Sequence, residues 1–490
     1  MSDIPSVLRQ AAKHYRGDYV APQMLEPNLQ KRLEQIILQL TIPTSELTNI
    51  SQNFYFELMN GLKAHKRHRN LWIPNECCFK MLDSYISNIP TGKEHGSYYA
   101  IDFGGSNCRA VRIKIHGNGK MERTQSTFTL KYSSVLGPKG LLDQTATATE
   151  LFDHFATEIG TVIKQSGDPL TPEEPLKVGF TFSFPCTMLS RNTAILLDWT
   201  KYFETGRATN DQVEGKDVGK LMDEAFKRNN INANVSIILN DTVGTLLSCA
   251  YQKPEDYPEC RVGVILGTGF NICYAENDYE NFGYVGKIIN TECGNFDKEL
   301  PITPVDFEID YYTSNCGRRL LEKLIGAAYL GEIVRRYMIL LLREKAPRVM
   351  WHIGTFTSVD GGEILNDPSE DHQVAKEIAL RRWGVELSQE VLVGLHKICE
   401  FVFGRSAGLA AAAIAATARK ACTFAKIRTT IAIDGSLYVK NEWYKNKLHE
   451  YLDQVIRPDL RGNVVLLASD DGSGKGAAIA AAMFDNRHFI

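Results

Sequence analysis

Two glycine turns, each placed directly after an apolar run, are the first features of this sequence that could do chemistry. One is Asp102-Phe-Gly-Gly-Ser-Asn107, and the other is Gly267-Thr-Gly-Phe-Asn271. Glycines remove side-chain bulk, so the backbone N–H groups of such turns can approach an anion. Arg109 adds a guanidinium fork for phosphate, and Asp102 could orient a magnesium-bound water. Taken alone, each turn is equally compatible with a plain hairpin.

A carboxylate that could act as a base lies between these two turns in the sequence. Asn240 and Asp241 follow the apolar strand that ends at Leu239 and precede Thr242-Val-Gly-Thr. There, Asp241 could accept a hydroxyl proton while the oxygen attacks phosphorus. The residues alone favour a simpler role, in which Asp241 caps a helix.

Hydroxyl and ammonium groups gather beside aromatic residues at Ser183, Thr200 and Lys201. This combination suits a polyol, which needs several directed hydrogen bonds, although the residues alone are better explained by a buried aromatic strand with a loop after it. Gly474-Lys475 is compatible at first sight with a P-loop. That pattern requires glycine at position 469, which is Ser469 here, and Ser or Thr at position 476, which is Gly476 here. A glycine-lined adenosine pocket at a helix N-terminus fits better.

The elements that must position these groups alternate between strand and helix after a helical region of about 90 residues. Strands are predicted at 98–103, 108–115, 126–132, 177–184, 235–239, 261–267, 271–276 and 463–468, and helices at 150–164, 215–228, 318–342 and 388–422. A strand–glycine turn–strand unit therefore occurs twice, at 98–115 and 261–276. The duplication predicts two related α/β domains that face each other with ligand between them.

Composition narrows the class of protein. The 490 residues are 44% hydrophobic and carry a formal net charge of -3, which gives no overall field for nucleic acid or anionic membranes. The eleven scattered cysteines and the lack of a secretory signal predict reduced thiols and a cytoplasmic location. The longest apolar run, 408–419, is too short to span a bilayer, so no integral membrane segment is expected.

The order and spacing of the motifs resemble those of the eukaryotic hexokinase family over about residues 30 to 485. The motifs include Phe-Ser-Phe-Pro-Cys at 182–186, Trp-Thr-Lys at 199–201, Asn-Thr-Glu at 290–292, Leu-Glu-Lys at 321–323 and Asp-Asp-Gly-Ser-Gly-Lys-Gly at 470–476. The pattern is similar to a single unit of about 50 kDa, and the long loop after Lys201 looks most like hexokinases of apicomplexan parasites.

The resemblance implies an α/β protein with the actin-like ATPase (ribonuclease H-like) fold and two α/β domains around a central cleft. The large domain would hold 1–89 and 241–471, and the small domain 90–240 and 472–490. The implied reaction is transfer of the γ-phosphoryl group of ATP to the 6-hydroxyl of glucose or a similar hexose, with Mg²⁺ carried by ATP and no directly bound metal. No nucleic acid partner is implied, and a homo-oligomer is left open.

The same resemblance implies a role for each matching residue. Asp241 would be the catalytic base, with Lys201 assisting. The sugar-binding set would be Ser183, Thr200, Lys201, Asn240, Asp241, Asn271, Glu292 and Glu322. ATP would contact Asp102, Gly104, Gly105, Ser106, Asn107, Arg109, Thr242, Gly267, Thr268 and Gly269, with Gly435, Ser436 and Ser473 near adenosine.

Some residues depart from the family pattern. Cys108 and Cys293 replace usual aromatic residues, Ser106 replaces threonine, and Arg319 stands where many relatives have glutamine, while 202–212 is longer than usual. Phe270 is also unusual, and we expect its side chain to point into the large domain so that only its backbone meets ligand.

Two alternative functions remain at this stage. One is a sugar sensor of the same fold with poor catalysis, and the other is an unrelated chaperone- or actin-like ATPase. The complete acceptor set argues against the second, and the retained Asp241 argues against the first.

Overall fold

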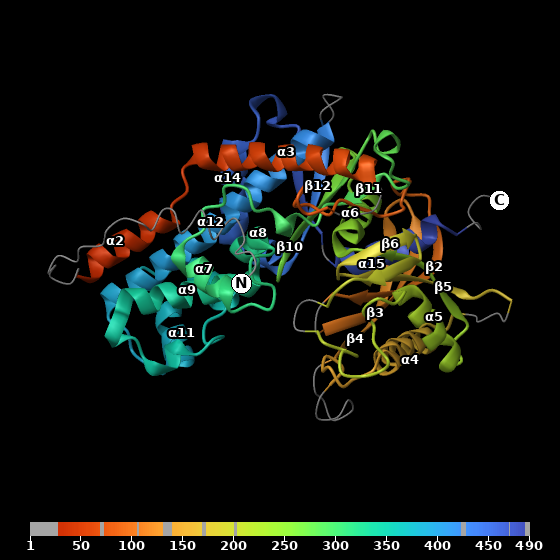
Figure 1. The fold of residues 1–490 in the computed structure, drawn as a ribbon, viewed down its shortest axis with the longest axis horizontal. Coiled ribbons are helices and arrows are strands. Elements are labelled where there is room, and N and C mark those ends of the chain that lie inside the picture. The colour runs from red at the N-terminus through yellow and green to blue at the C-terminus, as the bar shows by residue number, and fades with distance from the viewer. Residues whose placement is uncertain are drawn as a thin grey trace.

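The computed structural model describes residues 28–68, 73–104, 107–130, 140–168, 173–199, 203–422, 428–469 and 471–485. The chain forms two lobes, each built around one sheet (Figure 1). The five-stranded sheet has the order β4 (Lys120–Thr129), β3 (Asn107–Gly117), β2 (His95–Phe103), β5 (Leu176–Phe182), β8 (Ala233–Leu239). The six-stranded sheet has the order β1 (Leu82–Asp83), β11 (Ile288–Asn290), β10 (Phe270–Ala275), β9 (Cys260–Leu266), β12 (Thr429–Asp434), β13 (Val464–Ala468).

The two sheets repeat one topology. In the first, β2 pairs antiparallel with β3 and parallel with β5, and β5 continues parallel to β8. In the second, β9 pairs antiparallel with β10 and parallel with β12, and β12 continues parallel to β13. The predicted duplication of an α/β unit is therefore confirmed. A short hairpin of β6 (Cys186–Ser190) and β7 (Thr193–Leu196), which the sequence did not predict, follows β5.

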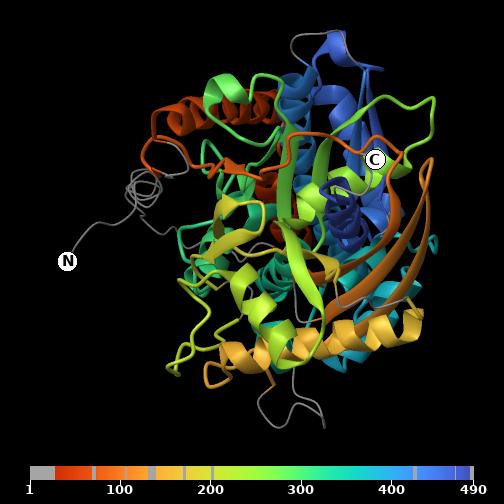
Figure 2. The same ribbon diagram turned by 90° about the vertical axis from the view of Figure 1, so that its right-hand side faces the viewer.

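Helices cover both faces of the five-stranded sheet because successive residues of a strand point to opposite sides. Ile101 packs with α4 (Ala148–Ser166) and α5 (Val218–Arg228), whereas its neighbour Ala100 packs with α6 (Asp241–Gln252) and α15 (Gly472–Met483). Figure 2 shows α4 lying along the outer side of this lobe. A Cβ on Gly476 would lie 2.0 Å from the carbonyl oxygen of Gly244, so α6 and α15 meet backbone to backbone.

The larger lobe is organised around α12 (Gln389–Cys422), which packs against α3 (Thr44–His68), α9 (Ala327–Leu342) and α14 (Glu442–Val455) (Figure 1). The remaining helices of this lobe are α2 (Leu29–Leu40), α7 (Pro304–Tyr311), α8 (Leu320–Ile325), α10 (Ser358–Leu365), α11 (Gln373–Trp383) and α13 (Ser436–Val439). Of the helices that the structure describes, α12 alone is long and apolar enough to cross a membrane, but 89% of its most apolar window is buried. That burial is typical of a core helix.

The predicted single helix at 318–342 is wrong, because two helices, α8 and α9, meet there at Gly326. This residue is extended, with φ -65° and ψ 137°, and a Cβ on it would lie 2.8 Å from the carbonyl oxygen of Thr268. The strand predicted at 126–132 is also displaced, since β4 runs from Lys120 to Thr129. The proposed domain boundaries stay a prediction, although every strand from 95 to 239, apart from the β6–β7 hairpin, belongs to the smaller sheet.

Candidate active site

One cavity of about 290 Å³ lies where the carboxyl ends of five central strands converge. Each strand is followed at once by a residue that lines the cavity: Gly104 after β2, Ser183 after β5, Asn240 after β8, Gly267 after β9 and Gly435 after β12. Ligand sites of open α/β sheets form at the carboxyl ends of strands in this way. The cavity therefore brings residues of both sheets to one place.

Most of the predicted site residues line this cavity. They are Asp102, Gly104, Arg109, Ser183, Asn240, Asp241, Gly267, Thr268, Gly269, Asn271, Glu292, Glu322, Gly435, Ser436 and Ser473. Gly105, Ser106, Thr200 and Lys201 lie outside the described residues, as does the side chain of Asn107. The roles proposed for those five therefore remain predictions.

The first glycine turn lies against the candidate base. A Cβ on Gly104 would lie 3.0 Å from the hydroxyl oxygen of Ser183 and 4.0 Å from Oδ2 of Asp241. Glycine at this position therefore leaves space between the turn and the Asp241 carboxylate. That space is where an acceptor oxygen and a phosphoryl group would meet.

Asp241 is not the helix cap that its position in the sequence favoured. Asn240 caps α6 instead, since its Oδ1 accepts from the backbone N–H of Thr242 at 3.0 Å. Asp241 is the first residue of the helix, where the positive end of the dipole favours a carboxylate. Thr242 was predicted to contact phosphate. Its side chain is fully buried and donates to Asn240 Oδ1 at 2.7 Å, so this role stays a prediction.

The second glycine turn is held from behind by α9. The N–H groups of Ala327 and Ala328 donate to the carbonyl oxygens of Gly267 and Thr268 at 2.9 and 3.1 Å. In a planar trans peptide the C=O and the following N–H point in opposite directions. The N–H groups of Thr268 and Gly269 therefore face away from α9, toward the cavity, as an anion site requires.

A third turn packs directly on the second. Gly435 has φ 118°, and a Cβ on it would lie 2.5 Å from the carbonyl carbon of Leu266. Before it, Asp434 accepts from the N–H groups of Gly435 at 2.6 Å and Gly472 at 2.7 Å. Burial raises the pKa of the Asp434 carboxyl to about 6, despite these two hydrogen bonds, which favour the charged form.

Arg109 was expected to offer a fork to phosphate, and the structure shows what it contacts instead. Its Nε donates to Asp102 Oδ2 at 3.0 Å, and its Nη1 lies 2.5 Å from Asp471 Oδ1. The hydroxyl of Ser473 donates to the other oxygen of Asp102 at 2.5 Å. Ser473 therefore lies at the first glycine turn. To bind a phosphate group, Arg109 would have to release Asp102 or Asp471.

The opposite wall carries the amides and carboxylates expected to bind sugar. Asn271 Nδ2 lies 2.9 Å from Asn290 Oδ1 and 3.3 Å from both Asn240 Oδ1 and Glu292 Oε1. Asn290 Nδ2 also donates to Glu292 Oε1 at 3.0 Å. These bonds fix the orientation of a nearly buried acceptor set, which is what recognition of hydroxyl groups needs.

Arg319 lies between the two sugar-binding carboxylates. Its Nε and Nη2 donate to Glu322 Oε1 and Oε2 at 2.7 and 2.9 Å, and its Nη1 lies 3.4 Å from Glu292 Oε2. Although burial opposes the charge, the two carboxylates raise the pKa of this guanidinium above its ordinary value. In the sequence, Arg319 stood out only as a departure from the family pattern. Its contacts with Glu322 and Glu292 depend on how the chain folds, so the spacing of the residues could not predict them.

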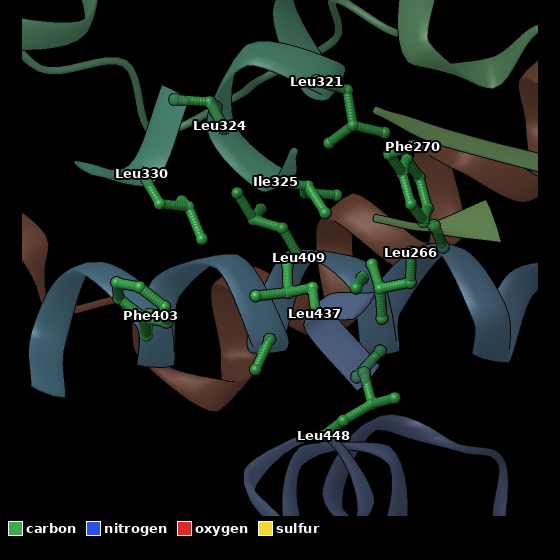
Figure 3. Packing of buried hydrophobic residues seen from close by; sticks show 14 of the residues in the cluster. Leu266, Phe270, Leu321, Leu324, Ile325, Leu330, Phe403, Leu409, Leu437 and Leu448 are labelled. Atoms are coloured by element: carbon green, nitrogen blue, oxygen red, sulfur yellow. The ribbon is translucent and has the colours of Figure 1, made fainter. Parts of the chain in front are cut away.

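Phe270 points away from the cavity, as expected. Its ring is buried with the core of the larger lobe, and Figure 3 shows it close to Leu266 and Leu321. Its backbone N–H lies 3.3 Å from Glu322 Oε2. The aromatic residue thus anchors the turn in the core while only its main chain faces ligand.

The cysteines in unusual positions are not available at the cleft surface. Cys108 and Cys293 are fully buried, and burial raises the pKa of both thiols, that of Cys293 to about 12. They fill space in the wall and have none of the exposure that a reactive thiol needs.

The long loop after residue 202 is packed against the smaller lobe. Phe203 stacks on Trp199 with ring centroids 5.4 Å apart, and the Thr205 hydroxyl donates to the carbonyl oxygen of Leu141 at 2.6 Å. Arg207 bridges Asp198 at 2.9 Å and Glu214 at 2.7 Å. These contacts brace both ends of the segment that contains Thr200 and Lys201.

Comparisons with known proteins agree with this geometry. A family model described as hexokinase matches residues 32–251, and a second with the same description matches 261–483. The chain is 51% identical to a hexokinase of Plasmodium falciparum, over 94% of this chain and 93% of that one. It is 44% identical to a hexokinase of Toxoplasma gondii, over 91% and 96% of the two chains.

Solved structures give the same result. A crystal structure of hexokinase aligns with a TM-score of 0.84 and 41% identity, covering 93% of this chain and 99% of that one. A hexokinase from Schistosoma mansoni, complexed with glucose, aligns with a TM-score of 0.79 and 27% identity over 93% and 100%. The expected resemblance to apicomplexan hexokinases and the actin-like ATPase fold are thus confirmed, and the chain belongs to the hexokinase family.

Proposed function

We propose that this protein transfers the γ-phosphoryl group of ATP to the 6-hydroxyl of glucose or a similar hexose. The observation that carries the proposal is the position of Asp241, whose Oδ2 faces the Gly104 turn inside a cavity lined by a second glycine turn and a sugar-binding wall. A hydroxyl is too weak an acid to ionise unaided, so a carboxylate must accept its proton as the bond to phosphorus forms.

The residues present fit a nucleotide phosphate chain. Glycines at 104, 267 and 435 leave a cradle that side chains would fill, and the N–H groups of Thr268 and Gly269 face it. Mg²⁺ would arrive with ATP and neutralise phosphate charge, with Asp102 placed to meet its water shell.

In this proposal each wall has a separate task. Asp241 accepts the proton from the attacking hydroxyl, while the two glycine turns stabilise charge on the phosphoryl oxygens through their N–H groups. Asn271, Glu292 and Glu322 orient the hexose so that its hydroxyl faces phosphorus. Since water would compete as acceptor, closure of the lobes over bound sugar would suppress ATP hydrolysis.

The location that we propose is the cytoplasm. All eleven cysteines are free, and ten of them are buried. Reduced thiols persist where glutathione and thioredoxin maintain a reducing environment.

A coupled assay of ADP release, with Mg-ATP and glucose, mannose, fructose or no sugar, tests the activity. We expect ADP only when a hexose is present. Equal ADP release without sugar would contradict the proposal and favour a general ATPase. Glucose binding by calorimetry without any turnover would instead favour the sensor of the same fold.

A further inference from the structure

The positive guanidinium of Arg319 makes the sugar-binding wall less negative than its two carboxylates alone would make it. Glu292 and Glu322 contribute two negative charges, and Arg319 reduces the sum of this triad to one. The side chains are well shielded from solvent, with exposures of 6% for Glu292 and 15% for Arg319. A charge at such a position acts strongly on a ligand because little water screens it.

The triad is built into the fold. Arg319 and Glu292 both adopt left-handed backbone conformations, with φ of 54° and 51°, which only a few per cent of non-glycine residues adopt. Two glycines make space for the triad, because a Cβ on Gly269 would lie 2.7 Å from Glu322 Oε2 and one on Gly294 would lie 3.0 Å from Glu322 Cβ. The surrounding backbone is therefore shaped around this ion pair.

Arg319 also supplies hydrogen-bond donors to a wall of acceptors. A guanidinium has five N–H groups. Its contacts with Glu322 and Glu292 use three of them, which leaves two without an acceptor among the described residues. A hydroxyl can donate to a carboxylate and accept from the guanidinium at once, whereas an ammonium group can only donate.

Asn240 and Asn271 separate the Glu292 and Arg319 side of the triad from Asp241, whereas Glu322 borders the second glycine turn at Gly269. A chain of contacts runs from Asn240, beside Asp241, to Asn271, then to Glu292 and finally to Arg319. When the 6-hydroxyl lies at Asp241, the ring carbon directly across from C5 in a pyranose is C2. The substituent at C2 would therefore reach the Glu292 and Arg319 side of the triad.

We propose that Arg319 is a specificity-determining residue that makes the sugar site favour a neutral hydroxyl over an ammonium group at C2. This inference rests on the proposed hexose phosphorylation. An amino sugar would bring its positive charge next to the guanidinium, which repels that charge and has no acceptor to offer it. Without Arg319 the same ammonium group would meet the Glu292 and Glu322 carboxylates with no guanidinium between them.

The test measures kcat/KM of wild type and R319Q for glucose, 2-deoxyglucose and glucosamine, at a pH where the amine is protonated. We expect KM for glucose to rise in R319Q. We also expect the glucosamine-to-glucose ratio of kcat/KM to rise at least about tenfold, equivalent to about 1.4 kcal/mol. 2-Deoxyglucose carries no charge at C2, so its ratio should change much less than that of glucosamine.

Two variants serve as controls. R318Q makes the same change at the exposed neighbouring residue and should leave all ratios unchanged. R319K keeps the charge but loses the bidentate fork, so KM for glucose should rise while the glucosamine-to-glucose ratio stays close to wild type. If R319Q does not fold, as judged by circular dichroism, R319M removes the charge while keeping a long side chain, and the same rise in the glucosamine-to-glucose ratio is expected of it.

If R319Q lowers kcat/KM by the same factor for all three sugars, the inference is overturned and Arg319 has a purely structural role. A fall of selectivity in R319K to the level of R319Q would also overturn it, because the charge would then not be the cause. Failure of wild type to phosphorylate any hexose would contradict the proposed function instead, so the two failures are distinguishable.

Discussion

The backbone N–H of Ala327 donates to the carbonyl oxygen of Gly267 at 2.9 Å, which joins the first turn of α9 to the glycine turn after β9. The first N–H groups of any helix lack partners within the helix. Here two of them orient the phosphate turn, because Ala328 repeats the contact with Thr268. The break between α8 and α9 is therefore what allows the turn to direct its own N–H groups at ligand.

This relationship predicts that Gly326→Ala impairs nucleotide binding selectively. The backbone of Gly326 is acceptable for alanine, but the added Cβ would lie 2.8 Å from Thr268 O and 3.3 Å from Gly269 Cα. The turn must therefore shift, and we expect KM for Mg-ATP to rise about tenfold or more. Steady-state kinetics measure KM, and calorimetry checks that the affinity for glucose is retained.

Gly404→Ala is the matched control for this substitution. Its nearest neighbour would lie 3.8 Å from the new Cβ, so it should behave like wild type. A normal KM for Mg-ATP in Gly326→Ala would show that α9 does not hold the turn.

The sequence could predict those parts of the site that depend on neighbouring residues, such as a glycine turn directly after an apolar strand. Glycine turns after apolar strands predicted both phosphate elements. The residues alone favoured a helix cap for Asp241, and only the family resemblance implied its role as the base. The roles of Asn271 and Glu292 were likewise implied by the resemblance. In the structure Asn271 belongs to β10 and Glu292 follows β11, and both line the cavity.

Other parts depend on contacts between distant segments, so no window of sequence contains them. The helix break at Gly326 exists because Thr268, 58 positions earlier, occupies the space beside it. A lone glycine in a helical pattern is usually tolerated, so the prediction of one helix followed the local signal. Arg109 likewise contacts Asp471, and Thr242 donates to Asn240. Both contacts compete with the phosphate binding predicted for these two residues.

Replacement of Asp241 tests the chemical step itself. We expect Asp241→Ala to lower kcat by a factor of about 10² to 10⁴, the range that general base catalysis contributes. Because the amides and glutamates of the opposite wall remain, glucose binding should be largely intact. Rapid-quench measurement of phosphoryl transfer, together with calorimetry of glucose, separates these quantities.

Asp241→Asn provides the closer comparison because it keeps the shape and removes only the basicity. It should be as slow as the alanine variant. Near-normal turnover in either variant would refute the assignment of Asp241 as the base.

Chemical labelling of thiols should be confined to one site. Cys316 is exposed, whereas the other ten cysteines are buried. Burial and the nearby Asp310 carboxylate raise the pKa of the Cys316 thiol, so we expect slow alkylation that accelerates as the pH rises. Intact-mass spectrometry after iodoacetamide treatment should show one adduct in the native protein.

Cys316→Ser should abolish that adduct without changing turnover. Early modification of Cys108 or Cys293, detected by peptide mapping, would contradict the closed wall described above.

The buried carboxyl of Asp434 should make stability depend on pH. Its pKa rises from 3.8 to about 6 on folding because burial disfavours the charged form. The folded state therefore holds this proton more tightly than the unfolded state. The stabilisation is complete below the unfolded pKa of 3.8 and is lost as the pH rises through about 6.

Asp434→Asn removes this titration and should reveal it. The free energy of unfolding of the variant minus that of wild type should increase between about pH 4 and pH 6 and then level off, because only wild type loses stability there. Urea unfolding at a series of pH values measures both quantities under identical conditions, so contributions from unrelated groups cancel. If this difference stays constant or falls over the interval, the pKa of Asp434 is not raised in the folded protein. The burial of its carboxylate beside Gly435 and Gly472 would then not have the expected effect.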